Sequence, residues 1–203
     1  MVHLLEEMEA YANENHIPIM LPDGIDFLTD YIKNNKVTKI LEIGTAIGYS
    51  AIKMALVDPR IHVVSIERDP ERYQIAVENV HKAHLEQRIE LIHKDAFDVV
   101  LEDTYDLIFI DAAKAQYIKF FEQYKQYLEK DGVIVSDNLN FHGYTHQKER
   151  IESKNLRQLV QKLNKYITFL HENKEFHTEF YEVGDGIGIS RRIGSLSNSV
   201  GGH

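Results

Sequence analysis

Residues 37–56 constrain the fold of this chain more than any other segment. An apolar run at 37–41 predicts a buried strand, and 50–56 predicts the first turns of a helix, with Gly44 and Gly48 between them. Glycine lets the backbone approach a ligand closely, and a helix N-terminus carries N–H groups that lack helical partners. The segment therefore predicts a nucleotide-sized binding corner. An ordinary strand-to-helix turn with a glycine cap is the alternative interpretation.

The glycine spacing indicates which nucleotide this corner would take. A dinucleotide-binding loop has the pattern G-x-G-x-x-G, whereas only Gly44 and Gly48 are present here. Glu42 lies near the end of the predicted strand, where it would repel a pyrophosphate but attract the cationic amino-acid end of S-adenosylmethionine (SAM). The sequence therefore favours SAM and disfavours a dehydrogenase.

Composition narrows the class of protein further. The 203 residues suit one domain, and a hydrophobic content of 43% with 27% charged residues is typical of a globular protein. No stretch approaches the ~20 apolar residues that span a bilayer, so we expect a cytoplasmic protein without membrane contact. The absence of cysteine excludes thiolate chemistry, and the net charge of −9 weighs against wholesale nucleic-acid binding.

The order of predicted elements indicates an α/β fold. Apolar strands at 38–43, 62–66, 89–93, 107–111 and 132–136 alternate with helices at 50–56, 70–83, 114–128 and 149–170. This alternation predicts a Rossmann-like αβα sandwich with a mostly parallel sheet, extended by an antiparallel hairpin at 175–182 and 186–191. We expect one domain over 1–194, with N-terminal helices within about 1–35. The Gly/Ser-rich residues 195–203 are expected to be a disordered tail or an expression remnant.

An acidic residue ends or follows each of the five predicted strands: Glu42, Glu67, Asp95, Asp111 and Asp137. Ligands of open parallel sheets bind beyond the carboxyl ends of the strands, so these acids are candidate ligand contacts. For any single acid, helix capping is the alternative. Glu67 would accept hydrogen bonds from the ribose hydroxyls or else contact the following helix, and Asp95 with Ala96 would meet the adenine edge.

Three of the polar residues predict a metal site. Asp111, Asp137 and Asn138 offer only oxygen donors, which suit Mg²⁺ or another hard divalent cation. Lys114 follows Asp111 by three residues and would act there as a general base, unless it is a surface lysine at a helix start.

The motifs at 41–50, 109–114 and 136–138, with the hairpin at 184–186, resemble the cation-dependent O-methyltransferases, which include the catechol and caffeoyl-CoA methyltransferases. The resemblance covers about 20–192 and implies a class I SAM-dependent methyltransferase fold. It implies that SAM is bound by Met20, Glu42, Gly44, Ser50, Glu67, Asp95, Ala96 and Asp111. It further implies that Asp111, Asp137 and Asn138 hold the cation, and that Lys114 and Asp111 are catalytic, with Lys114 as the base.

The sequence at 17–20, 111–117 and 137–143 is similar to a bacterial branch that includes the tRNA 5-hydroxyuridine methyltransferase. The plant caffeoyl-CoA enzymes carry an acid where Ala113 stands, and the gating aromatics of the catechol enzymes are not evident. The resemblance therefore implies methylation of 5-hydroxyuridine at the tRNA wobble position, giving 5-methoxyuridine. Like a catechol, this base offers two adjacent oxygens to a cation.

A basic run within 148–165 is placed where the phosphates of an anticodon stem could rest, although a solvated helix face is the alternative. A small-molecule catechol or caffeoyl-CoA-like methyltransferase is the alternative function, and a non-catalytic nucleoside-binding protein is a third. We also expect a homodimer, formed through an apolar stripe of Leu4, Leu5 and Met8 on the first helix.

Overall fold

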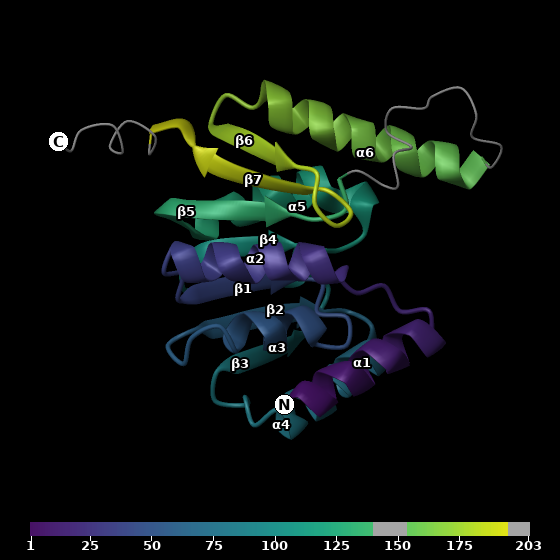
Figure 1. Ribbon diagram of the computed structural model, residues 1–203. Coiled ribbons are helices and arrows are strands. Elements are labelled where there is room, and N and C mark those ends of the chain that lie inside the picture. Colours follow the sequence, from purple (N-terminus) through teal and green to yellow (C-terminus); the bar gives the residue numbers. More distant parts are fainter. Residues whose placement is uncertain (140–153, 195–203) are drawn as a thin grey trace. The chain divides into compact units, whose positions relative to one another are not determined.

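The chain divides into two units, Met1–Glu102 and Asp103–His203, each with its own strands and helices (Figure 1). The computed structural model describes residues 1–139 and 154–194 of the sequence. The predicted single domain over 1–194 stays a prediction, and residues 195–203 lie outside the described residues.

The first unit is built on parallel strands. These are β1 (Lys39–Ile43), β2 (His62–Glu67) and β3 (Ile89–His93), in the order β3-β2-β1. In the parallel pairing of β1 with β2, Glu42 lies opposite Ser65. After its first residue β1 is wholly buried, as expected of an apolar strand in a parallel sheet. The register thus brings two polar side chains together within an apolar sheet.

Two of the helices in the first unit begin at residues that favour a helix N-terminus. They are α1 (Val2–Glu14), α2 (Pro22–Asn34), α3 (Tyr49–Ala55) and α4 (Pro70–Lys82), with a 3₁₀ turn, η1, at Ala96–Asp98. Both α2 and α4 start at a proline, whose fixed φ suits the first helical position. Asp69 caps α4 by accepting from the N–H groups of Glu71 and Arg72.

The apolar stripe of α1 is buried within the chain itself. Leu4 and Met8 are only 9% and 2% exposed, and Leu5 is half-buried. The reason given for a homodimer, an unpartnered stripe, is therefore wrong, because folding of the chain already covers these side chains. The homodimer itself stays a prediction.

The second unit combines a parallel pair of strands with an antiparallel hairpin. Its strands are β4 (Tyr105–Ile110), β5 (Leu128–Ser136), β6 (Phe176–Tyr181) and β7 (Ile187–Arg192), in the order β4-β5-β7-β6. β4 and β5 are parallel, whereas β7 runs antiparallel to both β5 and β6 (Figure 1). The predicted α/β class, with mostly parallel strands and a C-terminal antiparallel hairpin, is confirmed.

The predicted helix at 114–128 is only partly correct. The structure has a 3₁₀ turn η2 (Lys114–Gln116), the helix α5 (Tyr117–Tyr124) and a second 3₁₀ turn η3 (Lys125–Tyr127). Leu128 instead begins β5, because it pairs with Tyr105 of β4. The longest helix described here, α6 (Lys154–Glu172), runs beside β6 (Figure 1).

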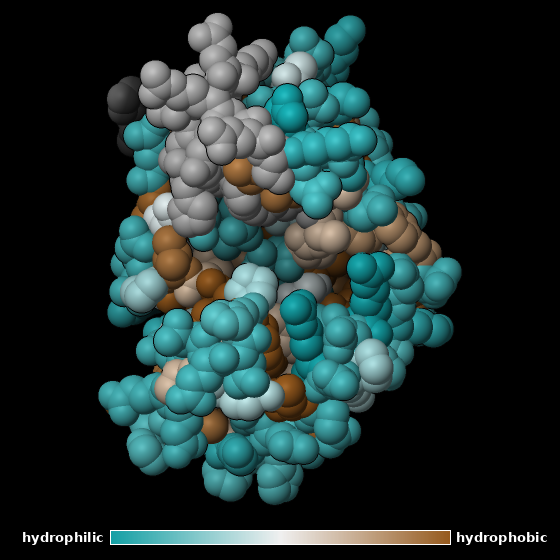
Figure 2. Space-filling view, turned by 90° about the vertical axis from the view of Figure 1, so that its right-hand side faces the viewer, coloured by the Kyte–Doolittle hydropathy of each residue, from teal (hydrophilic) through white to brown (hydrophobic). Residues whose placement is uncertain are grey.

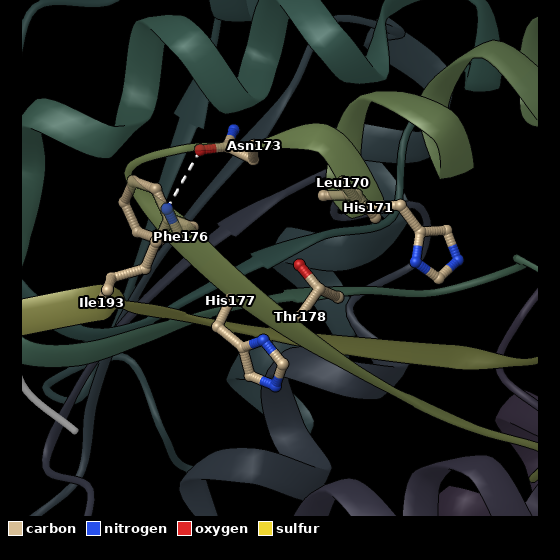
Figure 3. A pocket seen from close by; sticks show the side chains of 7 residues that line it. All are labelled: Leu170, His171, Asn173, Phe176, His177, Thr178 and Ile193. Atoms are coloured by element: carbon tan, nitrogen blue, oxygen red, sulfur yellow. Dashed lines mark hydrogen bonds between the residues drawn. The ribbon is translucent and has the colours of Figure 1, made fainter.

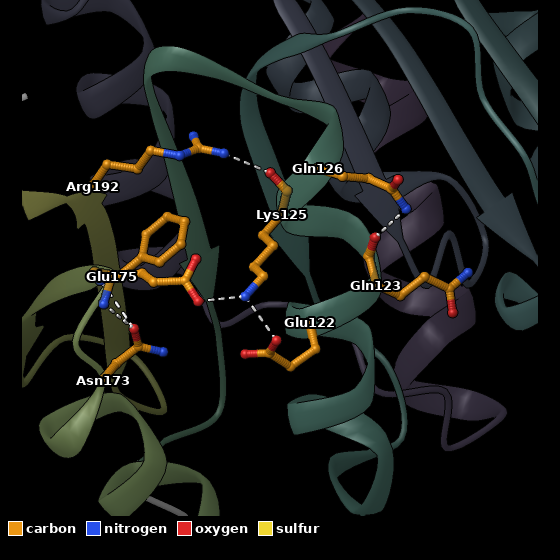
Figure 4. Close-up of polar contacts among 8 residues, drawn as sticks. Glu122, Gln123, Lys125, Gln126, Asn173, Glu175 and Arg192 are labelled. Atoms are coloured by element: carbon orange, nitrogen blue, oxygen red, sulfur yellow. Dashed lines mark hydrogen bonds and ion pairs between the residues drawn. The ribbon is translucent and has the colours of Figure 1, made fainter. Parts of the chain in front are cut away.

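Aromatic packing and a polar cluster hold the second unit together. The ring of Phe121 on α5 meets Phe169 on α6 at 5.3 Å and Phe176 on β6 at 5.1 Å, both edge-on. Nearby, Lys125 Nζ lies 2.8 Å from Glu122 Oε2 and 2.7 Å from Glu175 Oε1 (Figure 4). These contacts join α5 and η3 to the segment that leads into β6.

The surface in the view of Figure 2 is mostly hydrophilic, with hydrophobic side chains scattered among the polar ones. Within 1–139 and 154–194, none of the helices combines the length and the apolar character that crossing a membrane would take. The cytoplasmic location stays a prediction.

Candidate functional site

The glycine loop after β1 is folded against the end of β2. The N–H groups of Gly44 and Thr45 donate to the carbonyl oxygen of Ile66, at 3.0 and 3.2 Å. The N–H of Ala46 donates to Oε2 of Glu67 at 2.8 Å. Gly44 and Ala46 both have positive φ, at 101° and 49°. The loop thus takes a tight path with left-handed residues, at one of which, Gly44, glycine is the residue that adopts this conformation most readily.

Gly48 has a conformation that favours glycine, and it lies close to α4. Its φ is 87°, and a Cβ placed on it would lie 3.4 Å from Cβ of Ala76 on α4. Asn79, one turn further along α4, donates from Nδ2 to the carbonyl oxygen of Ile47 at 2.9 Å. Helix α4 therefore packs directly on the loop and holds its shape.

Glu42 is buried in a network of hydroxyl groups. Its side chain is 0% exposed, and its two carboxyl oxygens accept hydrogen bonds from Ser50 and Ser65. Thr45 and Ser65 share a further hydrogen bond of 2.6 Å. Burial raises the pKa of Glu42 to about 7, although the two serine hydrogen bonds oppose this shift. Near neutral pH the carboxyl group can therefore take or lose a proton.

Glu67, the predicted ribose ligand, contacts the backbone on both sides of it. Besides accepting from Ala46, its Oε1 accepts from the N–H of Asp69 at 2.9 Å, and the residue is 8% exposed. Asp69 is the residue that caps α4, so by accepting from the N–H of Asp69, Glu67 makes the contact to the start of the following helix that was its alternative role. Its ribose role stays a prediction.

The remaining predicted cofactor residues of this unit are also located. Asp95 accepts from the N–H of Phe97 at 3.0 Å and lies 3.7 Å from a guanidinium nitrogen of Arg68. Asp95 therefore caps η1, and its adenine role stays a prediction. Ala96 and Met20 are buried, at 8% and 5% exposure.

The predicted metal ligands converge at the carboxyl ends of β4 and β5. Asp111 directly follows β4 and Asp137 directly follows β5, and the register pairs the last residues of the two strands. Asn138 Nδ2 lies 2.9 Å from Asp111 Oδ1 and 3.4 Å from Asp137 Oδ2. The three side chains therefore meet at one point, as their positions in the sequence predicted.

This donor set fits a hard divalent cation. Two carboxylates supply oxygen donors of the kind that Mg²⁺ prefers, and the amide of Asn138, whose Nδ2 donates to both of them here, would turn its oxygen toward a bound cation. Among the described residues no group of three His, Cys, Asp or Glu side chains could hold a metal ion, so the cluster needs the amide of Asn138 as its third member. Asn138 adopts φ 63°, a left-handed conformation that asparagine tolerates better than most residues. The metal itself stays a prediction.

Lys114, the predicted base, is the first residue of η2. Its side chain lies outside the described part of the structure, so its catalytic role stays a prediction.

Several residues of the site were not predicted from the sequence. Ser65 donates a hydrogen bond to Glu42. The sequence feature that could have indicated Ser65 is a small polar residue among the apolar residues of β2. Tyr117 donates from its hydroxyl to the carbonyl oxygen of Asp137 at 3.2 Å. Tyr166 and Ser136 share a hydrogen bond of 2.6 Å immediately before Asp137. Neither tyrosine had a signal beyond the helical spacing of core residues.

A cavity of about 310 Å³ lies elsewhere in the second unit, at the end of α6 and the start of β6 (Figure 3). It is lined by Leu170, His171, Asn173, Phe176, His177, Thr178 and Ile193. None of the predicted site residues lines it, so it is separate from the cluster at Asp111, Asp137 and Asn138.

Comparison with known proteins identifies the family. The O-methyltransferase family matches residues 2–193. A Staphylococcus aureus protein, provisionally named a caffeoyl-CoA O-methyltransferase, has a structure that matches with a TM-score of 0.89 and 37% identity, over 93% of this chain and 91% of that one. The caffeoyl-CoA O-methyltransferase of Stellaria longipes is 31% identical over 82% of this chain and 73% of its own length.

The fold extends to more distant relatives. The O-methyltransferase of Bacillus cereus, solved in complex with S-adenosylhomocysteine, matches with a TM-score of 0.80 at 24% identity, over 94% of this chain and 90% of that one. The predicted class I methyltransferase fold and the predicted class of enzyme, a SAM-dependent O-methyltransferase, are both confirmed. The chain therefore belongs to the O-methyltransferase family.

Proposed function

We propose that this enzyme moves the methyl group of SAM to a hydroxyl group that is held by a divalent cation. The observation that carries the proposal is the convergence of Asp111, Asp137 and Asn138 at the ends of β4 and β5. Two carboxylates within reach of one amide repel each other, and a cation bound among them would relieve that repulsion.

The residues of each unit supply a different part of the reaction. Glu42, Glu67 and Asp95 of the first unit would bind the ammonium, ribose and adenine of SAM, respectively. When bound, the cation would supply positive charge that makes the acceptor hydroxyl more acidic. Lys114 would take the proton from that hydroxyl, whose oxygen would then attack the methyl carbon of SAM in line with the departing sulfur.

For the acceptor we favour a hydroxylated nucleoside in RNA, specifically 5-hydroxyuridine at the tRNA wobble position. The supporting feature is the outer face of α6, which carries exposed Lys154, Arg157, Lys162 and Lys165. The acidic residue of α6 is Glu172, at its last position. Such a row of cations suits the phosphates of a nucleic-acid backbone, even though the whole chain carries a net charge of −9.

A small catechol or a caffeoyl-CoA-like thioester is the second candidate acceptor. The Stellaria longipes relative is named for caffeoyl-CoA, which favours this alternative. Coenzyme A also carries phosphate groups, so the basic face of α6 alone does not separate a thioester from an RNA.

Methyl transfer from labelled SAM tests these proposals. The enzyme would be assayed with Mg²⁺ and then with a chelator, on tRNA that contains 5-hydroxyuridine, on catechol and on caffeoyl-CoA, with products identified by mass spectrometry. We expect chelator-sensitive formation of 5-methoxyuridine at a much higher rate than catechol methylation. Full activity in the chelator would refute the metal, and inert tRNA beside a methylated small molecule would refute the RNA acceptor.

A charge-reversal variant tests the role of α6. In Lys162→Glu/Lys165→Glu we expect weaker tRNA binding and a less steep salt dependence, with the slope reduced by about one for each phosphate that the variant no longer binds. The rate with catechol should stay unchanged. Lys33→Glu/Lys82→Glu, at exposed positions of α2 and α4, changes the net charge equally, and this matched control should leave tRNA binding as it is. Equal effects of the two variants on tRNA binding would refute the proposal that α6 contacts the tRNA.

A further inference from the structure

The hydroxyl group of Tyr117 contacts the backbone of Asp137. Tyr117 begins α5 and is 0% exposed. Its hydroxyl donates to the carbonyl oxygen of Asp137 at 3.2 Å. A buried hydroxyl needs such a partner, and here the partner belongs to a proposed metal ligand. One side chain from another element thus holds the backbone between two proposed ligands.

The carbonyl group that Tyr117 contacts belongs to the peptide that joins the two ligands. Orientation of this peptide sets ψ of Asp137 and φ of Asn138, and the latter is 63°, in the left-handed region. Hydrogen bonds hold the backbone on either side of this peptide. The N–H of Asp137 donates to the carbonyl oxygen of Ile110 at 3.3 Å, and the N–H of Leu139 donates to that of Gly186 at 3.0 Å. Tyr117 fixes the orientation of the peptide between these two hydrogen bonds, and without Tyr117 the peptide could rotate.

The ring of Tyr117 is itself held in place. It packs edge-on against Tyr166 of α6, with ring centroids 5.1 Å apart and an interplanar angle of 78°. The hydroxyl of Tyr166 is hydrogen-bonded to Oγ of Ser136 at 2.6 Å.

We propose that Tyr117 is a positioning residue that presets the Asp137–Asn138 peptide for the divalent cation. The inference rests on the proposed metal site and adds to it a residue that does not itself bind the cation. Groups that orient metal ligands from behind contribute strongly to metal affinity, because the ligands then need no rearrangement on binding. Without its hydroxyl, the peptide would sample other orientations and the cation would bind more weakly.

The test compares Tyr117→Phe with Tyr124→Phe, a variant of another fully buried tyrosine on α5. Each variant keeps its ring and loses one buried hydroxyl of the same helix, so we expect similar losses of stability in denaturant titrations. Mn²⁺ binding, followed by the loss of the electron paramagnetic resonance signal of free Mn²⁺, is measured without SAM or acceptor. We expect the Kd for Mn²⁺ to rise about tenfold in Tyr117→Phe and to stay unchanged in Tyr124→Phe.

Three results would overturn the inference, and they differ in whether they also refute the proposed metal site. If Tyr117→Phe binds Mn²⁺ as tightly as the wild type, the positioning role is refuted while the metal site stands. If both variants lose affinity equally, packing of the core is responsible and the hydroxyl of Tyr117 has no special role. If the wild type binds no Mn²⁺, the proposed metal site falls and the inference falls with it. Near-ultraviolet circular dichroism verifies that each variant is folded.

Discussion

Replacing Glu42 with glutamine should change how the stability of the protein depends on pH. The glutamate has a folded-state pKa of about 7, whereas its ordinary value is 4.5. A difference of about 2.5 in pKa corresponds to about 3 kcal/mol of free energy of unfolding. Glutamine has nearly the same shape but does not ionise, so the Glu42→Gln variant lacks this pH-dependent contribution.

The sign of the effect follows from which state holds the proton more tightly. Between pH 4.5 and about 7 the folded protein keeps the Glu42 proton and the unfolded chain does not. The stability that this proton contributes is present in full below pH 4.5 and is lost as the pH rises through about 7. Relative to the wild type, Glu42→Gln should therefore gain up to about 3 kcal/mol between acidic and mildly alkaline pH.

Urea denaturation of both proteins, from about pH 5 to about pH 8.5, measures this gain directly. The histidines titrate over the same range, but they are common to both proteins and cancel in the difference between them. Ser65→Ala provides a second measurement. Because the Ser65 hydrogen bond lowers the pKa of Glu42, removing it should move the midpoint of the pH dependence upward.

A difference in stability between Glu42→Gln and the wild type that does not vary with pH would refute this reasoning. It would mean that Glu42 ionises in the folded state as easily as in the unfolded chain, in spite of its complete burial. The same titration bears on cofactor binding, since a carboxylate attracts the ammonium group of SAM. We expect the affinity of the wild type for SAM to increase with pH over this window, and that of Glu42→Gln to vary less.

Three further substitutions test other parts of the structure. Gly48→Ala should lower the free energy of unfolding by about 1–2 kcal/mol in a denaturant titration, because alanine is strained at φ 87°. Asp137→Ala should abolish Mg²⁺ binding by calorimetry and methyl transfer with it, while SAM still binds; retained Mg²⁺ binding would place the cation elsewhere. Tyr49→Phe removes a 2.5 Å hydrogen bond to Glu9 and should cost about 1 kcal/mol, whereas an unchanged melting curve would show that this bond contributes nothing.

The sequence predicted the strands and their terminal acids well, because both depend on local patterns. An apolar run that ends in an acid can be recognised in a few consecutive residues. In the structure, Asp111 and Asp137 follow β4 and β5 directly. The rule that parallel strands present their carboxyl ends at one edge then brought these acids together without any knowledge of register.

Residues that act through pairing or packing could not be predicted in this way. Ser65 supports Glu42 only because the register of β1 and β2 sets them opposite each other, and that register is a property of the folded sheet. Tyr117 has the helical spacing of a core aromatic, and its ring does pack in the core. Its hydroxyl finds a partner only because folding brings the carbonyl group of Asp137, directly after β5, within reach.

The division of the chain at Glu102 and Asp103 also separates most residues assigned to the methyl donor from those assigned to the acceptor. All the donor residues except Asp111 precede this boundary, from Met20 to Ala96, whereas the proposed metal ligands and the basic face of α6 follow it. Substitutions in the second half of such a gene, at positions other than Asp111, could therefore alter which hydroxyl is methylated without changing residues assigned to SAM. A lineage could thus acquire new acceptors, from small phenols to nucleic acids, while the donor half is inherited nearly unchanged.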